Sequence, residues 1–508
     1  MKSILEYLEK TVLRTPEKTA FVCENDSISF NDLKEKSQII GVHLAKKLSG
    51  VRNEPICIIA DRSIETLICM FACLYSGNYY VIVDSDLPTE RIQLMIESVD
   101  FAGVIDCSNG KENIDNSNVI FKYGTTDNEV LSEEDRELIA LIRSESRSFD
   151  PMYGIFTSGS TGVPKLVVKS HQALISFIDS FVEMFEFTSD EILGNQFPFY
   201  FDASTKDIFV CLKCGITTYI IPKKMFSFPT SLVEYIENKK ITTIVWVPSA
   251  LTLVANAGAL DGNNYLSRLR KVFFVGEQMP VKQLNYWKRN LINTRFINLY
   301  GSTEVAGNFL FYEYNTILDD ESRLPTGKVF PNVKVFLLNE DDKLVTDNEM
   351  GEICVVGETL SLGYYKNNTL TDKVFVQNPL VDYREIIYKT GDIATYDKSG
   401  NIVWKSRKDF QIKHMGFRIE LSEIETIIGS IPEIEECCCT YDSKQKKILL
   451  FYQAQTDLKS IIGKKVRSSL PKYMYPGKYY RLEQMPHNAN GKIDRRLLKE
   501  KTMSMEKK

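Results

Sequence analysis

A nine-residue stretch between two apolar runs has the composition of an anion-binding loop. It consists of Thr157, Ser158, Gly159, Ser160, Thr161, Gly162, Val163, Pro164 and Lys165. Glycines let the backbone bend with positive φ and approach a ligand closely, and successive N–H groups in such a bend form a nest for an anion. Hydroxyls add donors and Lys165 adds a point charge. The stretch therefore predicts a phosphate-binding loop between two strands, in preference to an ordinary polar hairpin turn.

An aromatic run, residues 196–201, ends at Asp202 beside Ala203 and Ser204. Asp202 has two interpretations at this point. It could cap the helix that follows, or it could be a carboxylate at the rim of an apolar pocket. In the second case, low dielectric would make it a good partner for a ligand ammonium.

Two further carboxylates follow predicted strands. Glu304 lies in a small polar loop after residues 296–300, and it is a candidate Mg²⁺ ligand because a nucleotide polyphosphate normally travels with Mg²⁺. A solvated loop acid is the other interpretation of Glu304. Asp392 follows Thr390 and Gly391, where a strand could open onto a cleft.

The elements that would position these groups alternate between strand-like and helix-like segments over roughly the first 300 residues, which predicts an α/β domain with mostly parallel sheets. From about residue 325, short strands separated by turns predict a small antiparallel or barrel-like part. A polar segment, residues 406–409, marks a domain boundary. The remaining residues, roughly 100, have their own helix and strands and are expected to form an α+β unit.

The composition is that of a globular protein of 508 residues with two or more domains. A net charge of −5 gives no basic surface for nucleic acid. No apolar run approaches the roughly 18 residues of a membrane span, and the N-terminus has no secretory signal pattern, so we expect a cytoplasmic protein. The eleven cysteines indicate packed, reduced thiols. The one C-x-x-C pair, Cys211 and Cys214, has neither a second such pair nor nearby histidines to complete a zinc site, and the four histidines show no metal-ligand spacing.

The order of the motifs resembles the adenylate-forming superfamily of acyl-CoA synthetases, luciferases and peptide-synthetase adenylation domains. It is most similar to the amino-acid adenylation branch and to D-alanine:carrier protein ligases, from about residue 10 to about residue 500. The motifs that carry the resemblance are residues 29–33, 77–84 with Arg91, 157–165, 201–204, 298–304, 351–364, 388–392, 407–425, 470–474 and 490–492.

The resemblance implies a large N-terminal domain of parallel-type sheets with helices and a small barrel-like part (residues 1–408), and a small, mobile α+β C-terminal domain (residues 409–508) with a hinge at Asp409. It also implies two half-reactions. A carboxylate attacks the α-phosphate of ATP, forming an acyl-adenylate and pyrophosphate, and a thiol then attacks the adenylate. Such displacement needs positioning and charge neutralisation more than covalent help.

ATP and Mg²⁺ are the cofactors that the resemblance implies. The loop would hold the β- and γ-phosphates, and Thr303 and Glu304 would lie by the α-phosphate and Mg²⁺. Lys492 would bridge the substrate carboxylate and the α-phosphate, reducing the repulsion between two anions. Tyr300 would stack on adenine, and Asp392 would accept both ribose hydroxyls, with Arg407 beside it. Nucleotide-binding residues outside the loop are expected to be Gly276, Glu277, Asn298, Tyr300, Gly301, Ser302, Asp392 and Arg407.

The resemblance assigns Asp202 to the amino group of the substrate. The implied acyl pocket comprises Asp202, Ala203, Lys206, Trp246, Phe273, Val275, Leu299, Gly307 and Asn308. Bulky residues with room left at Gly307 favour a small or flat acid: a small amino acid or an amino-aryl acid such as an anthranilate. Lys206 would either turn outward or meet an extra hydroxyl or carboxylate of the substrate.

The expected function is therefore activation of an amino-bearing carboxylic acid as acyl-AMP, followed by transfer to a phosphopantetheine thiol. The chain ends soon after Lys492, so we expect the carrier protein to act in trans. An acyl-CoA ligase and a non-catalytic nucleotide-binding scaffold are the competing hypotheses. Several positions depart from the family pattern, among them Leu166, Ser302, Ser406 and Met415.

Overall fold

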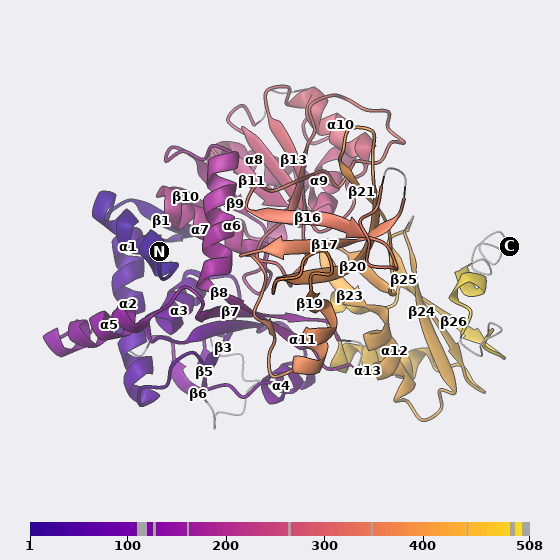
Figure 1. Ribbon diagram of the computed structural model, residues 1–508, viewed down its shortest axis with the longest axis horizontal. Helices are drawn as coiled ribbons and strands as arrows, with labels where there is room; N and C mark the ends of the chain where they lie inside the picture. Colours follow the sequence, from indigo (N-terminus) through magenta and orange to yellow (C-terminus); the bar gives the residue numbers. More distant parts are fainter. Residues whose placement is uncertain are drawn as a thin grey trace. The chain divides into compact units, whose positions relative to one another are not determined.

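The computed structural model describes residues 1–108, 119–124, 129–159, 162–262, 266–346, 349–443, 445–487 and 493–499. The chain forms two compact units (Figure 1). The first contains residues 1–85, 100–155 and 166–408, and the second contains residues 86–99, 156–165 and 409–508. The predicted fold class, an α/β N-terminal part followed by a smaller α+β part, is confirmed.

A nine-stranded sheet is the largest of the first unit. Its strands, in spatial order, are β15 (Lys328–Val329), β14 (Leu310–Glu313), β13 (Arg295–Tyr300), β12 (Lys271–Val275), β11 (Thr243–Trp246), β9 (Ile192–Asn195), β10 (Thr217–Ile220), β1 (Thr19–Cys23) and β2 (Asp26–Ser29). The strands from β13 to β1 are parallel, and the strands at the two edges run antiparallel to their neighbours. The parallel strands bring their carboxyl ends to one edge, where α/β proteins carry their ligand sites.

A second sheet follows the order β18 (Gly363–Tyr364), β8 (Lys165–Ser170), β7 (Pro151–Thr157), β4 (Tyr79–Asp84), β3 (Pro55–Ala60), β5 (Gly103–Asp106) and β6 (Val119–Lys122). Strands β3 and β4 are almost wholly buried, as expected for parallel strands covered on both faces. Helices of the first unit are α1 (Leu5–Arg14), α2 (Phe30–Lys47), α3 (Ile64–Tyr75), α5 (Glu133–Glu145), α6 (His171–Met184), α7 (Ser204–Cys214), α8 (Pro229–Asn238), α9 (Pro248–Asn256), α10 (Val281–Asn290) and α11 (Asn368–Val374).

Helix α6 carries a row of aromatic residues at a spacing of four, so that they lie on one face. The ring centroids of Phe177 and Phe181 are 5.4 Å apart, and those of Phe181 and Phe185 are 5.1 Å apart. The ring centroids of Phe181 and of Phe273 in β12 are also 5.1 Å apart. This row packs α6 against the nine-stranded sheet.

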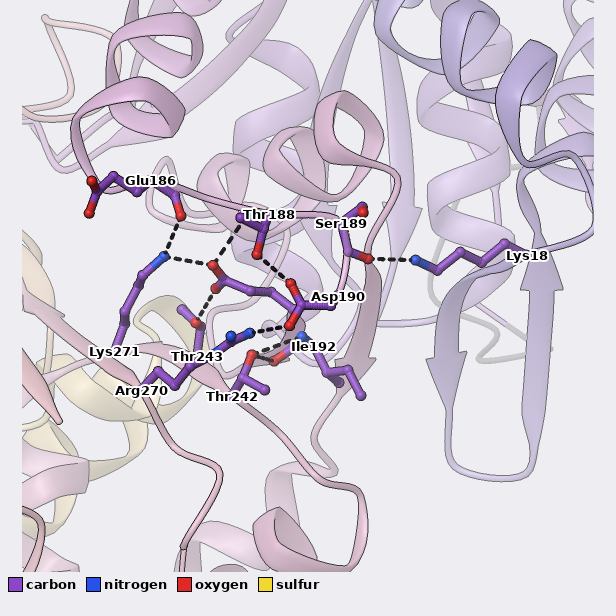
Figure 2. A network of polar contacts seen from close by, with 11 residues as sticks. Lys18, Glu186, Thr188, Ser189, Asp190, Ile192, Thr242, Thr243, Arg270 and Lys271 are labelled. Atoms are coloured by element: carbon purple, nitrogen blue, oxygen red, sulfur yellow. Dashed lines mark hydrogen bonds and ion pairs between the residues drawn. The ribbon is translucent and has the colours of Figure 1, made fainter. Parts of the chain in front are cut away.

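A polar network fixes the amino ends of β9, β11 and β12 (Figure 2). The Nζ atom of Lys271 lies 2.6 Å from Oε1 of Glu191, and Oε2 of Glu191 accepts a hydrogen bond of 2.6 Å from Thr243 Oγ1. Arg270 and Asp190 form an ion pair of 3.0 Å beside it. The network joins the loop before β9 to the neighbouring strand β11 and to β12 beyond it, at the end opposite to the predicted site.

The predicted small strand-rich part is an antiparallel sheet. It contains β16 (Val333–Leu338), β17 (Gly351–Gly357), β20 (Ile386–Tyr396), β19 (Phe375–Gln377) and β21 (Ile402–Arg407). Strands β20 and β21 pair with Asp392 opposite Arg407. The pairing explains how two motifs that are separate in the sequence come together.

The second unit has its own core of aliphatic and aromatic residues. Its elements are α4 (Thr89–Glu97), β22 (Gln411–His414), β23 (Phe417–Glu420), α12 (Leu421–Gly429), β24 (Glu436–Asp442), β25 (Lys447–Gln453), α13 (Lys459–Ser469) and β26 (Lys478–Leu482). All eleven cysteines of the chain are free thiols. Among the described residues, no helix has the length and apolar character needed to cross a bilayer.

Candidate active site

The loop between β7 and β8 has the backbone that its glycines predict. Gly162 has a φ of 84°, and a Cβ atom on Gly159 would lie 2.0 Å from the carbonyl oxygen of Val163. Ser160 and Thr161 lie outside the described residues. The described part therefore has the tight turn of an anion-binding loop.

The loop belongs to the second unit, and other groups of the same unit contact it. The N–H of Gly159 donates to Glu423 Oε2 at 3.3 Å, and Ser158 Oγ accepts a bond of 3.0 Å from the N–H of Glu420. Arg91 forms an ion pair of 2.5 Å with Glu423. Burial raises the pKa of the Glu423 carboxyl and Arg91 opposes the rise. A loop N–H thus already binds a negatively charged group in this structure.

Asp392 is the centre of a second cluster. One of its oxygens, Oδ2, accepts a hydrogen bond from the hydroxyl of Tyr300 and lies 3.0 Å from Arg407 NH1. The other, Oδ1, accepts a bond of 2.8 Å from Nε1 of Trp404. Burial and the neighbouring Asp392 raise the pKa of Tyr300, so its hydroxyl remains a donor. The predicted proximity of Arg407 to Asp392 is present in the structure.

The loop after β13 contains buried polar atoms that suit a nucleotide. The hydroxyl of Ser302 and Oδ1 of Asn308 are buried and have no hydrogen-bond partner within the described part of the chain. Such atoms in a native structure call for a partner. The loop is also tight, since a Cβ atom on Gly301 would lie 2.6 Å from the carbonyl oxygen of Gly307. Ser302 and Gly301, which were predicted to bind the nucleotide, therefore fit a bound ATP, and Asn308, which was predicted to line the acyl pocket, fits a polar group of the acid.

Glu304 is almost fully buried, and its Oε1 accepts a hydrogen bond of 2.8 Å from the hydroxyl of Tyr364. Thr303, beside it, is partly buried. In the described ranges, no cluster of three or more His, Cys, Asp or Glu side chains could hold a metal by itself. Mg²⁺ usually binds through one or two carboxylates together with substrate phosphates. A single carboxylate at Glu304 therefore fits Mg²⁺ held with a nucleotide.

The residues predicted to line the acyl pocket from the large sheet divide between its two faces. Val275 is the partner of Leu299 in the parallel register, and Phe273 lies two positions before Val275, so these three share a face. Trp246 is the partner of Phe274 and lies on the opposite face. The structure brings the first three together and separates Trp246 from them.

Other predicted residues at this edge have structural partners. Nε1 of Trp246 donates to the carbonyl oxygen of Gly194, at 3.2 Å. Asn298 donates to the carbonyl oxygen of Pro325, at 3.3 Å. Gly276 has a φ of 99°, and Glu277 after it accepts a bond from the N–H of Ser249, at 3.0 Å. The strand ends are thereby held in place.

Asp202 does not cap the following helix. Helix α7 begins after Ala203, which is its N-cap and makes no side-chain cap bond. Instead, Oδ1 of Asp202 accepts a hydrogen bond of 2.7 Å from the Tyr153 hydroxyl and lies 2.5 Å from Nζ of Lys169. The Asp202 side chain keeps 14% of its surface exposed, whereas that of Lys169 is fully buried. Asp202 therefore has a cation as its partner within the protein.

Lys206 lies one helical turn after Asp202, and it is only 2% exposed. The outward orientation considered from the sequence is therefore excluded. Its Nζ atom lies 5.6 Å from the centroid of the Phe177 ring. Burial lowers the pKa of Lys206 to about 8, and Asp202 and Asp207 oppose the shift.

The prediction that Gly307 leaves room in the acyl pocket is wrong. Gly307 has a φ of 72°, and a Cβ atom there would lie 2.3 Å from the ring of Phe177. The absence of a side chain lets α6 approach the loop, so the ring of Phe177 fills the space. Phe177 therefore contacts both Gly307 and Lys206, which places it in the same cluster.

Sequence reasoning missed Tyr153, Lys169, Phe177 and Trp404. Lys169 did carry a signal, because it follows three apolar residues in a predicted buried strand. A lysine is almost never fully buried unless it is paired. Its partner could not be found in the same way, because Asp202 is 33 residues away in the sequence.

Two predicted roles fall outside this description. Lys492, the predicted bridging lysine, lies outside the described residues, and its role stays a prediction. Asp409 is the first residue of the C-terminal segment of the second unit, and its Oδ1 accepts a bond of 3.2 Å from the N–H of Gln411. Its role as a hinge also stays a prediction.

Family models match most of the chain. The model described as "AMP-binding enzyme" matches residues 8–365, and the model described as "AMP-binding enzyme C-terminal domain" matches residues 423–492. The first match alone covers more than half of the 508 residues.

Curated relatives are similar over almost the whole chain. Zwittermicin A synthase ZmaJ of Bacillus cereus is 31% identical, covering 97% of this chain and 94% of the relative. A D-alanine--D-alanyl carrier protein ligase of Bacillus mycoides (strain KBAB4) is 30% identical, covering 97% of this chain and 98% of the relative. Bacitracin synthase 1 of Bacillus licheniformis is 30% identical over 98% of this chain, which spans only 9% of that relative.

Solved structures share the fold. The Vibrio cholerae adenylation domain AlmE, in complex with glycyl-adenosine-5'-phosphate, has a TM-score of 0.82 at 20% identity, covering 99% of this chain and 98% of that chain. An artificially fused adenylation-PCP di-domain, NpsA-ThdA from Klebsiella oxytoca, has a TM-score of 0.77 at 22% identity, covering 95% of this chain and 94% of that chain.

Proposed function

The chain belongs to the AMP-binding enzyme family and is an acyl-adenylate-forming ligase, and from this premise we propose that it transfers the activated acyl group to a separate carrier protein. The substrate is a small carboxylic acid, whose oxygen attacks the α-phosphorus of ATP while the bond to pyrophosphate breaks. The phosphopantetheine thiol of the carrier then attacks the acyl carbon and displaces AMP. Support for a carrier in trans comes from the carrier protein ligases, which the chain matches over 98% of their length.

The observation that carries the proposal is the cluster around Asp392. A carboxylate offers about four acceptor positions, and Tyr300, Trp404 and Arg407 use three of them. A ribose hydroxyl fits the fourth position, and the second hydroxyl fits once Trp404 moves. Trp404 is 38% exposed, which leaves it room to do so.

The remaining side chains have complementary roles in this proposal. The loop 157–165 would bind the β- and γ-phosphates through its N–H groups, exchanging the carboxylate of Glu423 for phosphate. Glu304 would hold Mg²⁺, which when bound neutralises phosphate charge. Lys492 would neutralise the approaching carboxylate and α-phosphate. The free thiols throughout the chain support a reducing compartment, and we propose the cytoplasm.

The substrate's amino group stays a prediction. It rests on the assignment of Asp202, whose Oδ1 is bonded to Lys169 in this structure. Glycyl, alanyl and aminobenzoyl acids are therefore test substrates rather than conclusions.

The test is ATP–pyrophosphate exchange with a panel of acids, followed by transfer of the radiolabelled acyl group to holo-carrier proteins or to CoA. We expect exchange with one class of acid and transfer to a carrier. Thioester formed with CoA but with none of the carriers would favour the CoA ligase. ATP binding without exchange for any acid would favour the scaffold.

Asp392→Asn tests the nucleotide site. We expect kcat/KM for ATP to fall about 100-fold, because charge-assisted hydrogen bonds worth about 1.5 kcal/mol each are lost. The KM of the acid should change little. An equal rise in both KM values would contradict the assignment of Asp392 to ribose.

A further inference from the structure

We propose that the acid carries a second carboxylate, which binds Lys206, and that Lys169 replaces a substrate ammonium as the partner of Asp202. The inference rests on the proposed function and names its substrate class. It concerns five residues, which we call the Asp202 cluster: Tyr153, Lys169, Phe177, Asp202 and Lys206.

Asp202 already has a cationic partner within the protein. Nζ of Lys169 lies 2.5 Å from Oδ1, the same oxygen that accepts from the Tyr153 hydroxyl at 2.7 Å. The ammonium also donates to the carbonyl oxygen of Val305, at 3.3 Å. A partly buried carboxylate that is already paired with a fixed cation gains less from a second cation than an unpaired one would. The protein itself thus supplies what an amino acid would bring.

Lys206 is the second lysine of the Asp202 cluster. Within the described residues, no hydrogen bond or ion pair reaches its ammonium, although 98% of the residue surface is buried. Taking an ammonium out of water without hydrogen bonds is costly. Asp202 and Asp207 attract it only through space, and the face of Phe177 at 5.6 Å compensates only in part. A ligand anion would complete this environment.

Positive charge exceeds negative charge in the Asp202 cluster. The Asp202 cluster holds two ammonium groups and one carboxylate. The next carboxyl on the helix, Asp207, offsets this excess only in part, because it interacts electrostatically with the Arg62 guanidinium as well as with Lys206 and accepts a bond of 2.7 Å from Asn195. Burial raises the pKa of Asp207 to about 7, so at neutral pH it carries only part of its charge.

Glu304 is the remaining carboxylate near Lys169, and it is engaged elsewhere. It interacts electrostatically with Lys169, while its Oε1 accepts from Tyr364. Under the proposed function it also binds Mg²⁺. A substrate ammonium would make the cluster more positive, whereas a second carboxylate would neutralise it.

The experiment measures ATP–pyrophosphate exchange by the full chain with acids matched in length. Succinate is compared with 2-aminobutyrate and butyrate, and phthalate with anthranilate, to test the second carboxylate. Aspartate is compared with succinate to test whether an added amino group is accepted. We expect kcat/KM for the dicarboxylate to exceed that of the amino acid about 100-fold, because a site built for a polar group strongly rejects the analogue that lacks it. In Lys206→Met, kcat/KM for succinate should fall about 100-fold while that for butyrate changes less than about 3-fold.

The matched control is Lys271→Met, which also replaces a buried lysine by methionine but at the ion pair with Glu191. This variant should keep the preference of the natural protein for succinate over 2-aminobutyrate. A preference for 2-aminobutyrate or anthranilate, or an equal loss of both acids in Lys206→Met, would overturn the inference and leave the proposed function standing. A preference for aspartate over succinate would overturn the part concerning Lys169.

A binding measurement decides the inference even without exchange. In protein labelled with ¹³C at lysine Cε, succinate in the presence of AMP should raise the pKa of Lys206, with the signal assigned from Lys206→Met. Butyrate should leave it unchanged. The same pKa with both acids would overturn the inference, whereas a failure of exchange alone would count against the proposed function.

Discussion

Two lysine–carboxylate pairs differ in their surroundings, although their carboxylates lie just before and just after β9 along the chain. Glu191 precedes the strand and pairs with Lys271 at 2.6 Å, within the network of Figure 2. Asp202 follows the strand and pairs with Lys169 at 2.5 Å. Both lysines are almost fully buried, so burial alone does not separate the two sites.

The difference lies in how many partners each pair has. Glu191 accepts from Lys271 on Oε1 and from Thr243 on Oε2, and Lys271 also donates to the carbonyl oxygen of Glu186, at 3.1 Å. In this network the charges of Glu191 and Lys271 are each paired with a group of opposite charge within the protein. Beside Asp202 a second ammonium, Lys206, has no hydrogen bond or ion pair in the described part of the chain, and Asp202 and Asp207 attract it only electrostatically. A lysine–carboxylate pair whose charges balance is typical of a structural role, whereas a pair beside an extra charge is typical of a ligand-binding site.

Lys271→Met should give the largest effect on stability. It leaves Glu191 buried without its cation, so the free energy of unfolding should fall by about 3 kcal/mol, measured by urea denaturation. The ratio of kcat/KM between succinate and 2-aminobutyrate should stay constant. A changed ratio would mean that the network of Figure 2 influences the site.

Lys169→Met should instead change specificity. Asp202 would keep its bond to Tyr153 and some solvent exposure, so the loss of stability should be smaller, about 1–2 kcal/mol. Its freed carboxylate should raise kcat/KM for 2-aminobutyrate about 10-fold and lower that for succinate. The check is the exchange assay on both acids, and an unchanged ratio would remove the role given to Lys169.

The pH dependence should show the smallest effect. The pKa of Lys206 is about 8 in the folded protein, below its ordinary value of 10.5. The unfolded chain therefore binds more protons above pH 8, and stability should rise with pH in that window. Between pH 7 and pH 9 the gain should be about 1 kcal/mol relative to Lys206→Met.

This comparison with the variant cancels the titration of the buried thiols and tyrosines, which lose protons in the unfolded chain at higher pH. Asp207, with a pKa of about 7, changes the slope mainly below the window. Parallel pH profiles for the two proteins would show that Lys206 is not a buried, desolvated cation.

Much of the site was predictable because its signals are local. The small and hydroxyl residues of the loop 157–165 predict a tight turn, and Gly162 has the positive φ that they imply. Asp392 and Arg407 were expected side by side, and strand pairing places them opposite one another. Gly307 was misjudged because a missing side chain indicates either open space or close packing, and only the position of Phe177 distinguishes the two.

By itself, the sequence determined the α/β class, the order of the motifs and the family, since each depends on residue types at short spacing. Only the tertiary structure decided that Lys169 pairs with Asp202 and that Lys206 is buried against Phe177. These residues lie on a strand, a loop and two helices, and nothing in their local sequence fixes the distance between them. Their charges interact only because folding removes water from between those elements.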